Sequence, residues 1–84
     1  MQYIKDAILG DYYIVLDEYN FSAYKVITPD SGIPYDHCVG HYKNLSSALK
    51  QIADNTMKGK SYDSIKQYIS EYKSILNKFN EKFL

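Results

Sequence analysis

The segment HCVGHY, residues 37–42, contains the only two histidines and the only cysteine of this 84-residue chain. Imidazole and thiolate groups are preferred zinc ligands, and a thiol beside an imidazole is a common nucleophilic pair. Side chains alternate between the two faces of a strand, and His37 and His41 would have Cα atoms about 13 Å apart in one. We therefore predict no metal site and no catalytic pair with Cys38. We expect Cys38 to be a small core residue and the histidines to be surface groups.

No other residues have the spacing of a catalytic site. Asp17 and Glu18 lie at an expected hairpin turn, and Asp30 and Asp36 flank a loop rich in proline and glycine. The four glycines all stand alone, so the chain has no glycine-rich phosphate loop. The sequence predicts a protein that is not an enzyme and that needs no cofactor.

The length and composition predict one small domain. A single cysteine allows no internal disulfide and indicates a reducing compartment. The first residues lack the pattern of a signal peptide, and no apolar run approaches the roughly 20 residues of a membrane span. We expect a cytoplasmic protein without a membrane partner.

The order of elements predicts an α+β fold. Three β-rich segments, residues 12–17, 21–28 and 35–42, are joined by a short turn and a Pro/Gly loop, which favours a three-stranded antiparallel sheet. The sequence also leaves room for a short extra strand over residues 3–7. The spacing then changes to that of two helices, residues 44–59 and 61–84. The apolar face of the first helix consists of Leu45, Ala48, Leu49, Ile52 and Ala53. We expect Asn44 and Ser61 to cap their N-termini and Gly59 to end the first helix.

The second predicted helix has the most regular apolar pattern. Its apolar residues recur at alternating spacings of three and four, and Tyr68 and Ile75 widen the stripe on one flank. The stripe consists of Tyr62, Ile65, Ile69, Tyr72, Leu76, Phe79 and Phe83. This helix either packs within its own chain or uses an outer flank against another copy. Because small domains often need extra stabilisation, we expect a homo-oligomer. Its predicted interface consists of Tyr68, Tyr72, Ile75 and Phe79.

The junction between the third strand and the first helix is the candidate binding site. Helix N-termini attract anions because their N–H groups are free. His41, Tyr42 and Lys43 precede this point, and Ser46 and Ser47 follow it. A phosphate of a nucleotide or an acidic side chain could dock there. The alternative is that Asn44 simply caps the helix while Lys43 remains in solvent.

The formal net charge is zero, but the charge is divided between the two halves. Residues 1–40 carry a net charge of −4 and residues 41–84 a net charge of +4, and every basic residue is lysine. Lysines interleaved with tyrosines in the second half could bind nucleic acid, with Tyr62, Tyr68 and Tyr72 stacking on bases. Acidic residues dilute this charge, so a solvated amphipathic helix is the ordinary interpretation.

Two segments, YIVLDEYNFSAYKV (residues 13–26) and VGHYKNLSSALKQI (residues 39–52), carry a resemblance. They resemble a class of small proteins from phages and integrated mobile elements of low-GC Gram-positive bacteria. The shared features are an Asp/Glu-x-Asn turn at residues 17–20, a third strand ending G-x-Y at 40–42, and L-x-x-A-L-K at 45–50. The strand order also resembles integrase arm-type DNA-binding domains. Those domains use basic sheets, however, whereas these strands carry one lysine, Lys25.

The resemblance implies a biological setting more than a chemistry. Phage proteins of this size often antagonise host defence, as anti-CRISPR proteins do. It therefore implies a non-catalytic accessory protein that inhibits or sequesters a host component, either a protein or a small nucleotide signal. An acidic, tyrosine-rich sheet could meet a basic channel of a host effector. The alternative is a small nucleic-acid-binding or regulatory protein that uses the lysine-rich half.

Overall fold

The computed structural model describes residues 2–58 and 60–83. Along the chain these form β1 (Gln2–Ile4), the 3₁₀ turn η1 (Ala7–Leu9), β2 (Tyr12–Leu16), β3 (Phe21–Ile27), β4 (Tyr35–Tyr42), α1 (Leu45–Met57) and α2 (Ile65–Phe83). The expected stop at Gly59 and the expected end of the second helix at Leu84 lie outside the described residues. Neither α1 nor α2 combines the length and apolar character needed to cross a membrane.

All four strands form one antiparallel sheet in the order β1-β2-β3-β4. The predicted α+β class is confirmed, and the N-terminal strand is a full member of the sheet, because Tyr3 pairs with Val15. This strand ends earlier than residue 7. The Asp6 side chain accepts a hydrogen bond from the Ile8 N–H at 3.1 Å and so begins the η1 turn.

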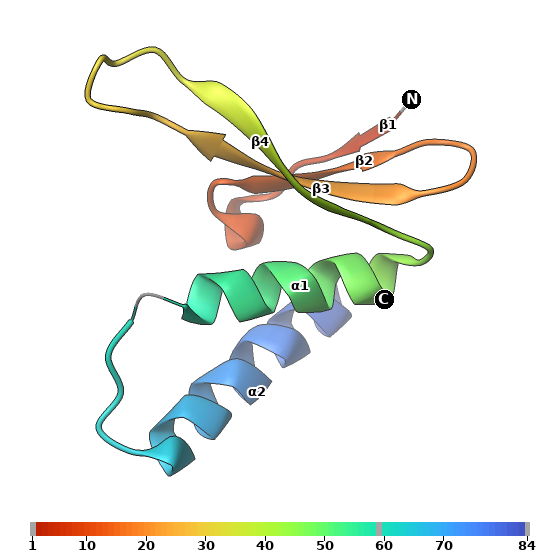
Figure 1. Ribbon diagram of the computed structural model, residues 1–84. Coiled ribbons are helices and arrows are strands. Elements are labelled where there is room, and N and C mark those ends of the chain that lie inside the picture. Colours follow the sequence, from red (N-terminus) through yellow and green to blue (C-terminus); the bar gives the residue numbers. More distant parts are fainter. Residues whose placement is uncertain (1, 59, 84) are drawn as a thin grey trace.

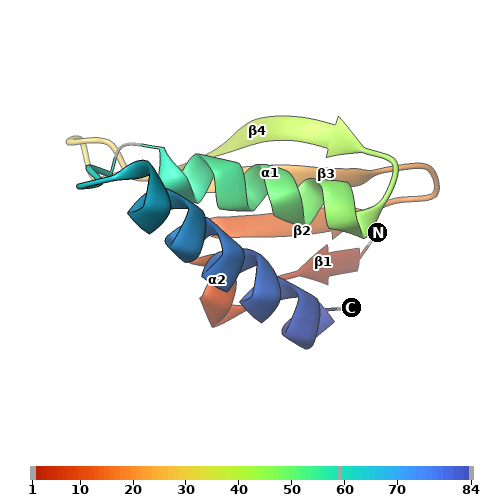
Figure 2. The same ribbon diagram turned by 90° about the horizontal axis from the view of Figure 1, so that it is seen from below.

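Both helices lie on one side of the sheet, and the other side carries no helix (Figure 1). Helix α1 runs under β3 and β4, and α2 crosses α1 and reaches towards η1, as the view from below shows (Figure 2). The predicted apolar face of α1 is confirmed, because its residues form the core together with Leu9, Ile14, Ala23 and Phe79. The buried residues of this face are Ala48, Leu49, Ile52, Ala53 and Met57.

Helix α2 begins later than residue 61, which corrects the predicted cap. The Ser64 hydroxyl accepts a hydrogen bond from the Gln67 N–H at 3.1 Å, and the Gln67 side chain accepts one from the Asp63 N–H at 2.7 Å. This is close to a capping box, in which a Ser and a Gln three residues apart satisfy free N–H groups. Tyr62 is therefore not a helical residue, and its hydroxyl donates to the Met57 carbonyl at 3.1 Å.

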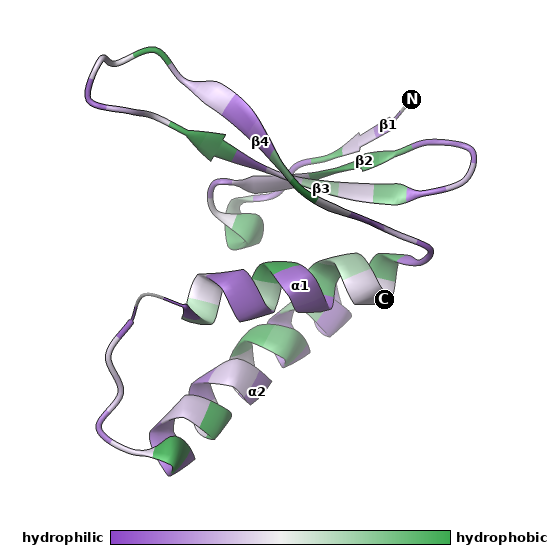
Figure 3. Cartoon of the chain, in the orientation of Figure 1, coloured by the Kyte–Doolittle hydropathy of each residue, from purple (hydrophilic) through white to green (hydrophobic). Residues whose placement is uncertain are grey.

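The apolar stripe of α2 packs mainly within its own chain. Phe79 is buried in the core, and Tyr72 and Ile75 are half-buried against it. The prediction that Phe79 lies at an interface between copies is therefore wrong, because the core of the same chain already buries its side chain. Hydrophobic residues remain uncovered at the start of α2 (Figure 3), where Ile65 is 80% and Ile69 46% exposed. Of the four predicted interface residues only Tyr68 is exposed, and self-association stays a prediction.

Candidate functional site

The sheet face opposite the helices presents a row of tyrosine rings. Because side chains alternate along a strand and Ile14 points into the core, Tyr13 projects from the open face. Tyr24 is its register partner on β3, and the two rings stack with their centroids 5.4 Å apart. Tyr3 on β1 extends the row, with its centroid 6.2 Å from that of Tyr13. Three strands thus contribute one continuous aromatic surface.

A positive charge already lies on this surface. The Lys5 ammonium group is 5.0 Å from the ring centroid of Tyr13 and 5.6 Å from that of Tyr3. Cations are attracted to the negative face of an aromatic ring at such distances. The rings are therefore arranged so that two of them can share one ammonium or guanidinium group.

A carboxylate lies next to the same rings. Burial raises the pKa of Tyr13 to about 12, and its hydrogen bond to Asp36 on β4 adds to this shift. The pKa of Tyr24 is also raised, first by burial and then by Cys38, through its charge and a hydrogen bond. Both phenols therefore stay protonated at neutral pH, and Asp36 supplies a negative charge beside them. We call the set Tyr3, Lys5, Tyr13, Tyr24 and Asp36 the tyrosine face.

A β-bulge in β4 changes the arrangement of the only cysteine and the histidines. Ala23 pairs with Gly40 and Tyr24 with Cys38, which leaves Val39 as an extra residue. The regular alternation is broken there, so Cys38 and His41 project from the same open face. The Cys38 Sγ is 3.8 Å from His41 Nε2, and His41 Nδ1 is 2.6 Å from the Ser22 hydroxyl.

This geometry corrects two sequence-based predictions. Cys38 is exposed and is not a core residue, and it does not face away from His41. His37 pairs with Lys25 beyond the bulge and lies on the helix side of the sheet, so it does not share a face with His41 as alternation predicted, and it points away from Cys38. The imidazole of His41 therefore contacts both the Cys38 thiol and the Ser22 hydroxyl. No group of three or more metal-ligating side chains occurs among residues 2–58 and 60–83.

The residues predicted to surround the α1 N-terminus do not converge there. The Asn44 side chain accepts a hydrogen bond from the Ser47 N–H at 2.8 Å, so the helix is capped from within. His41 projects from the open face, whereas Tyr42 packs against the core on the helix side. Lys43, Ser46 and Ser47 are exposed. Anion binding at this point stays a prediction.

The tyrosines of the lysine-rich half contact one another. Tyr62 meets Tyr68 edge-on with centroids 5.1 Å apart, and Tyr68 stacks on Tyr72 at 6.2 Å. Burial raises the pKa of Tyr72 to about 12, and its hydrogen bond to Asp54 on α1 adds to the shift. Tyr72 is thus engaged within the chain, and Tyr68 offers the most accessible ring of the three.

The tyrosine face was not identified from the sequence, although a signal for it existed. The turn at residues 17–20 fixes the register of the hairpin, and that register places Tyr13 opposite Tyr24. Alternation then assigns both to the face that lacks Ile14. The apolar face of this strand is the opposite one, on which Tyr12 and Ile14 pack into the core.

Comparison with known proteins adds no relative: no protein-family model, curated protein or solved structure matches this chain.

Proposed function

We propose that the protein is a non-catalytic binding protein that docks a cationic surface of a partner protein on its tyrosine face. The observation that supports this is the position of Lys5, whose ammonium group lies over two tyrosine rings of an otherwise open sheet face. A lysine or arginine of a partner can use the same aromatic surface. Tyrosine is also enriched in protein interfaces, because it gives a large apolar body with a polar tip.

The charge of the sheet half selects the kind of partner. Residues 1–40 carry a net charge of −4, and Asp36 lies directly beside the rings. Complementary charge speeds association and disfavours partners of the same sign. The acidic half would repel the phosphates of a nucleic acid. It would attract the basic side chains of a protein surface.

The resemblance to phage and mobile-element proteins suggests the setting. In this proposal the protein is an accessory factor that inhibits a component of host defence by covering its basic, nucleic-acid-binding surface. Expression in a phage-restricting host should then raise the plating efficiency of the phage. Tyr24→Ala should abolish this effect, while Tyr19→Ala, which changes an exposed tyrosine in the β2–β3 turn, should retain it.

Binding can be tested with two defined probes of opposite charge. We expect an oligo-arginine peptide to bind and to shift the amide resonances of Tyr13, Tyr24 and Cys38 in a nuclear magnetic resonance titration. Asp36→Lys should weaken this binding by about tenfold, because it replaces an attraction with a repulsion. A single-stranded oligonucleotide that binds the tyrosine face more tightly than the peptide would contradict the proposal and favour the nucleic-acid alternative.

A further inference from the structure

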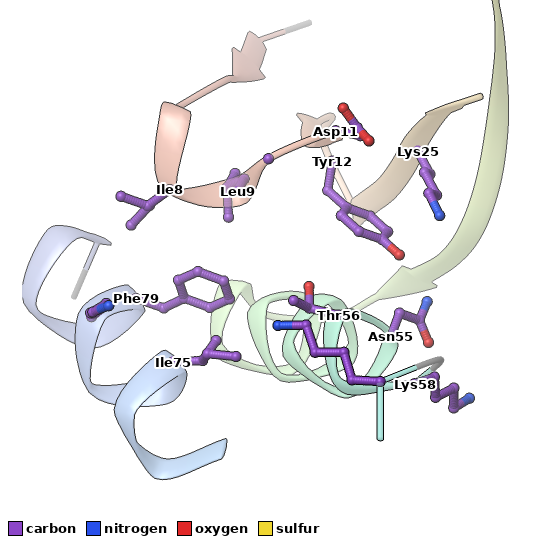
Figure 4. Close-up of a pocket in the computed structure, with 13 residues that line it drawn as sticks. Ile8, Leu9, Asp11, Tyr12, Lys25, Asn55, Thr56, Lys58, Ile75 and Phe79 are labelled. Carbon is purple, nitrogen blue, oxygen red and sulfur yellow. The ribbon is translucent and has the colours of Figure 1, made fainter. Parts of the chain in front are cut away.

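A cavity of about 540 Å³ lies between the helix-covered face of the sheet and the C-terminal end of α1 (Figure 4). Its floor is apolar and comes from three separate elements. Ile8 and Leu9 belong to η1, Ile75 and Phe79 to α2, and the ring of Tyr12 to β2. Sites for small organic ligands typically have volumes of roughly 300–1,000 Å³ and such apolar linings. The cavity therefore has the size and the floor of a ligand site.

Four lysines surround this apolar floor. They come from parts of the chain that are distant in sequence and are Lys25, Lys58, Lys60 and Lys78. Asp11 is the one carboxylate among the lining residues, so the lining carries a net charge of +3. Within the part of the chain that the structure describes, none of the four ammonium groups has a carboxylate oxygen within 4.0 Å. The fold thus gathers positive charge here without neutralising it.

Two polar residues of α1, Asn55 and Thr56, also line the cavity. The Asn55 side-chain oxygen accepts a hydrogen bond from Gln51 at 3.0 Å, which leaves the Asn55 amide hydrogens available. The Thr56 hydroxyl donates to the Ile52 carbonyl at 2.8 Å and can still accept a hydrogen bond. The site therefore offers one donor group and one acceptor group to the edge of a ligand.

We propose that this cavity binds a nucleotide, with the base against the apolar floor beside Tyr12 and the phosphates among the lysines. The net positive charge of the lining favours a nucleotide over a ligand with a single negative charge. A fatty acid brings one negative charge, which would leave most of the lysines unpaired, whereas a nucleoside triphosphate brings several. Base-sized aromatic groups stack on tyrosine, and Asn55 and Thr56 can meet the polar edge of the base.

This site is separate from the tyrosine face and from the α1 N-terminus. The cavity lies on the helix side of the sheet and at the opposite end of α1. The two proposals can therefore fail independently, because Tyr24→Ala removes a ring of the tyrosine face without altering the lining of the cavity. We expect the Tyr24→Ala variant to bind nucleotide as the wild-type chain does.

The test is calorimetric titration of the full chain with ATP, GTP, CTP and UTP at physiological ionic strength. We expect at least one of them to bind and the double variant Lys25→Glu/Lys78→Glu to weaken its binding by at least about tenfold. The matched control is Lys66→Glu/Lys73→Glu, which makes the same charge change at exposed lysines outside the lining. This control should change the affinity by less than about threefold, because these lysines do not line the cavity and salt screens exposed charges.

Two further probes test the apolar part of the site. Inorganic tripolyphosphate should bind more weakly than the nucleotide, because it makes no contact with the floor. Ile8→Glu places a charge on a partly exposed part of that floor and should weaken nucleotide binding while leaving the circular dichroism spectrum unchanged. The proposal is overturned if no nucleotide binds, if tripolyphosphate binds equally well, if oleate binds more tightly, or if the control variant loses as much affinity as Lys25→Glu/Lys78→Glu.

Discussion

The imidazole of His41 is held across two strands by Ser22, whose hydroxyl lies 2.6 Å from His41 Nδ1. Ser22 is 4% exposed, so its hydroxyl has little access to water. The pair joins β3 to β4 on the open face, next to the bulge that brings Cys38 within 3.8 Å of the same ring.

We predict that Ser22→Ala lowers the free energy of unfolding by about 1 kcal/mol, the usual contribution of such a hydrogen bond. His41→Ala should cost a similar amount. Because both changes remove the same interaction, the double variant should cost clearly less than the sum of the two. Urea denaturation measures all three values. Strictly additive losses would show that the hydrogen bond contributes nothing.

Gly40 is required by the packing of Tyr42. A Cβ atom at Gly40 would lie 2.6 Å from the Tyr42 hydroxyl and 3.0 Å from the ring carbon that bears it. The ring packs against the core, so it cannot move away freely. We predict that Gly40→Ala costs about 1–3 kcal/mol, the range of overpacking strain.

Tyr42→Phe provides the matched test of this contact, because it deletes the closest atom. In the Tyr42→Phe background, Gly40→Ala should cost less than in the wild-type chain, as measured by thermal or urea unfolding. If the cost of Gly40→Ala were the same in both backgrounds, the strain would have to lie elsewhere.

The start of α2 can be tested with two serines three residues apart. Ser64→Ala removes the hydroxyl that accepts from the Gln67 N–H and should cost about 1 kcal/mol. Ser61 is exposed and precedes the helix, so Ser61→Ala should stay within about 0.5 kcal/mol of wild type. Chemical denaturation compares them. A larger loss for Ser61→Ala would support the earlier, sequence-based helix start.

Tyr13 and Tyr72 have the most strongly raised pKa values of the tyrosines and should ionise last. The pKa values of Tyr13 and Tyr72 are raised to about 12 from 10.0. The folded chain therefore holds these two protons more tightly than the unfolded chain. Their contribution to stability is complete below about pH 10 and is lost as the pH rises towards about 12.

Ultraviolet titration of tyrosinate formation tests this assignment. Tyr13→Phe and Tyr72→Phe should each remove one late-titrating group. Asp36→Asn should move the pKa of Tyr13 down towards 10.0, since the Asp36 carboxylate contributes to raising it. An unchanged late group in the Tyr13→Phe variant would contradict the assignment.

Local periodicity was sufficient to predict much of the architecture. Alternation and turn residues located β2, β3 and β4 nearly to the residue, and the spacing of Ala48, Leu49, Ile52 and Ala53 gave the buried face of α1. Ser64 and Gln67 also have the spacing of a capping box in the sequence, whereas the N-cap was predicted at Ser61. These features depend on residues within one or two turns of each other, so a single sequence contains them.

The sites depended on contacts between residues far apart in the chain. The bulge at Val39 is set by the pairing of β4 with β3, and it reverses the side-chain alternation that had separated Cys38 from His41. The crossing of α2 over α1 buries Phe79 and leaves Ile65 exposed, although both belong to one apolar stripe.

The sequence by itself determined the strands, the helices and the division of charge, because each follows from residue type and local spacing. Only the tertiary structure placed Tyr3 and Asp36 beside the Tyr13–Tyr24 pair, since this needs the registers of β1 and β4. It also gathered Lys25, Lys58, Lys60 and Lys78 around one apolar cavity. The registers of β1 and β4, the bulge position and the helix crossing result from packing across the whole chain, and no local pattern encodes them.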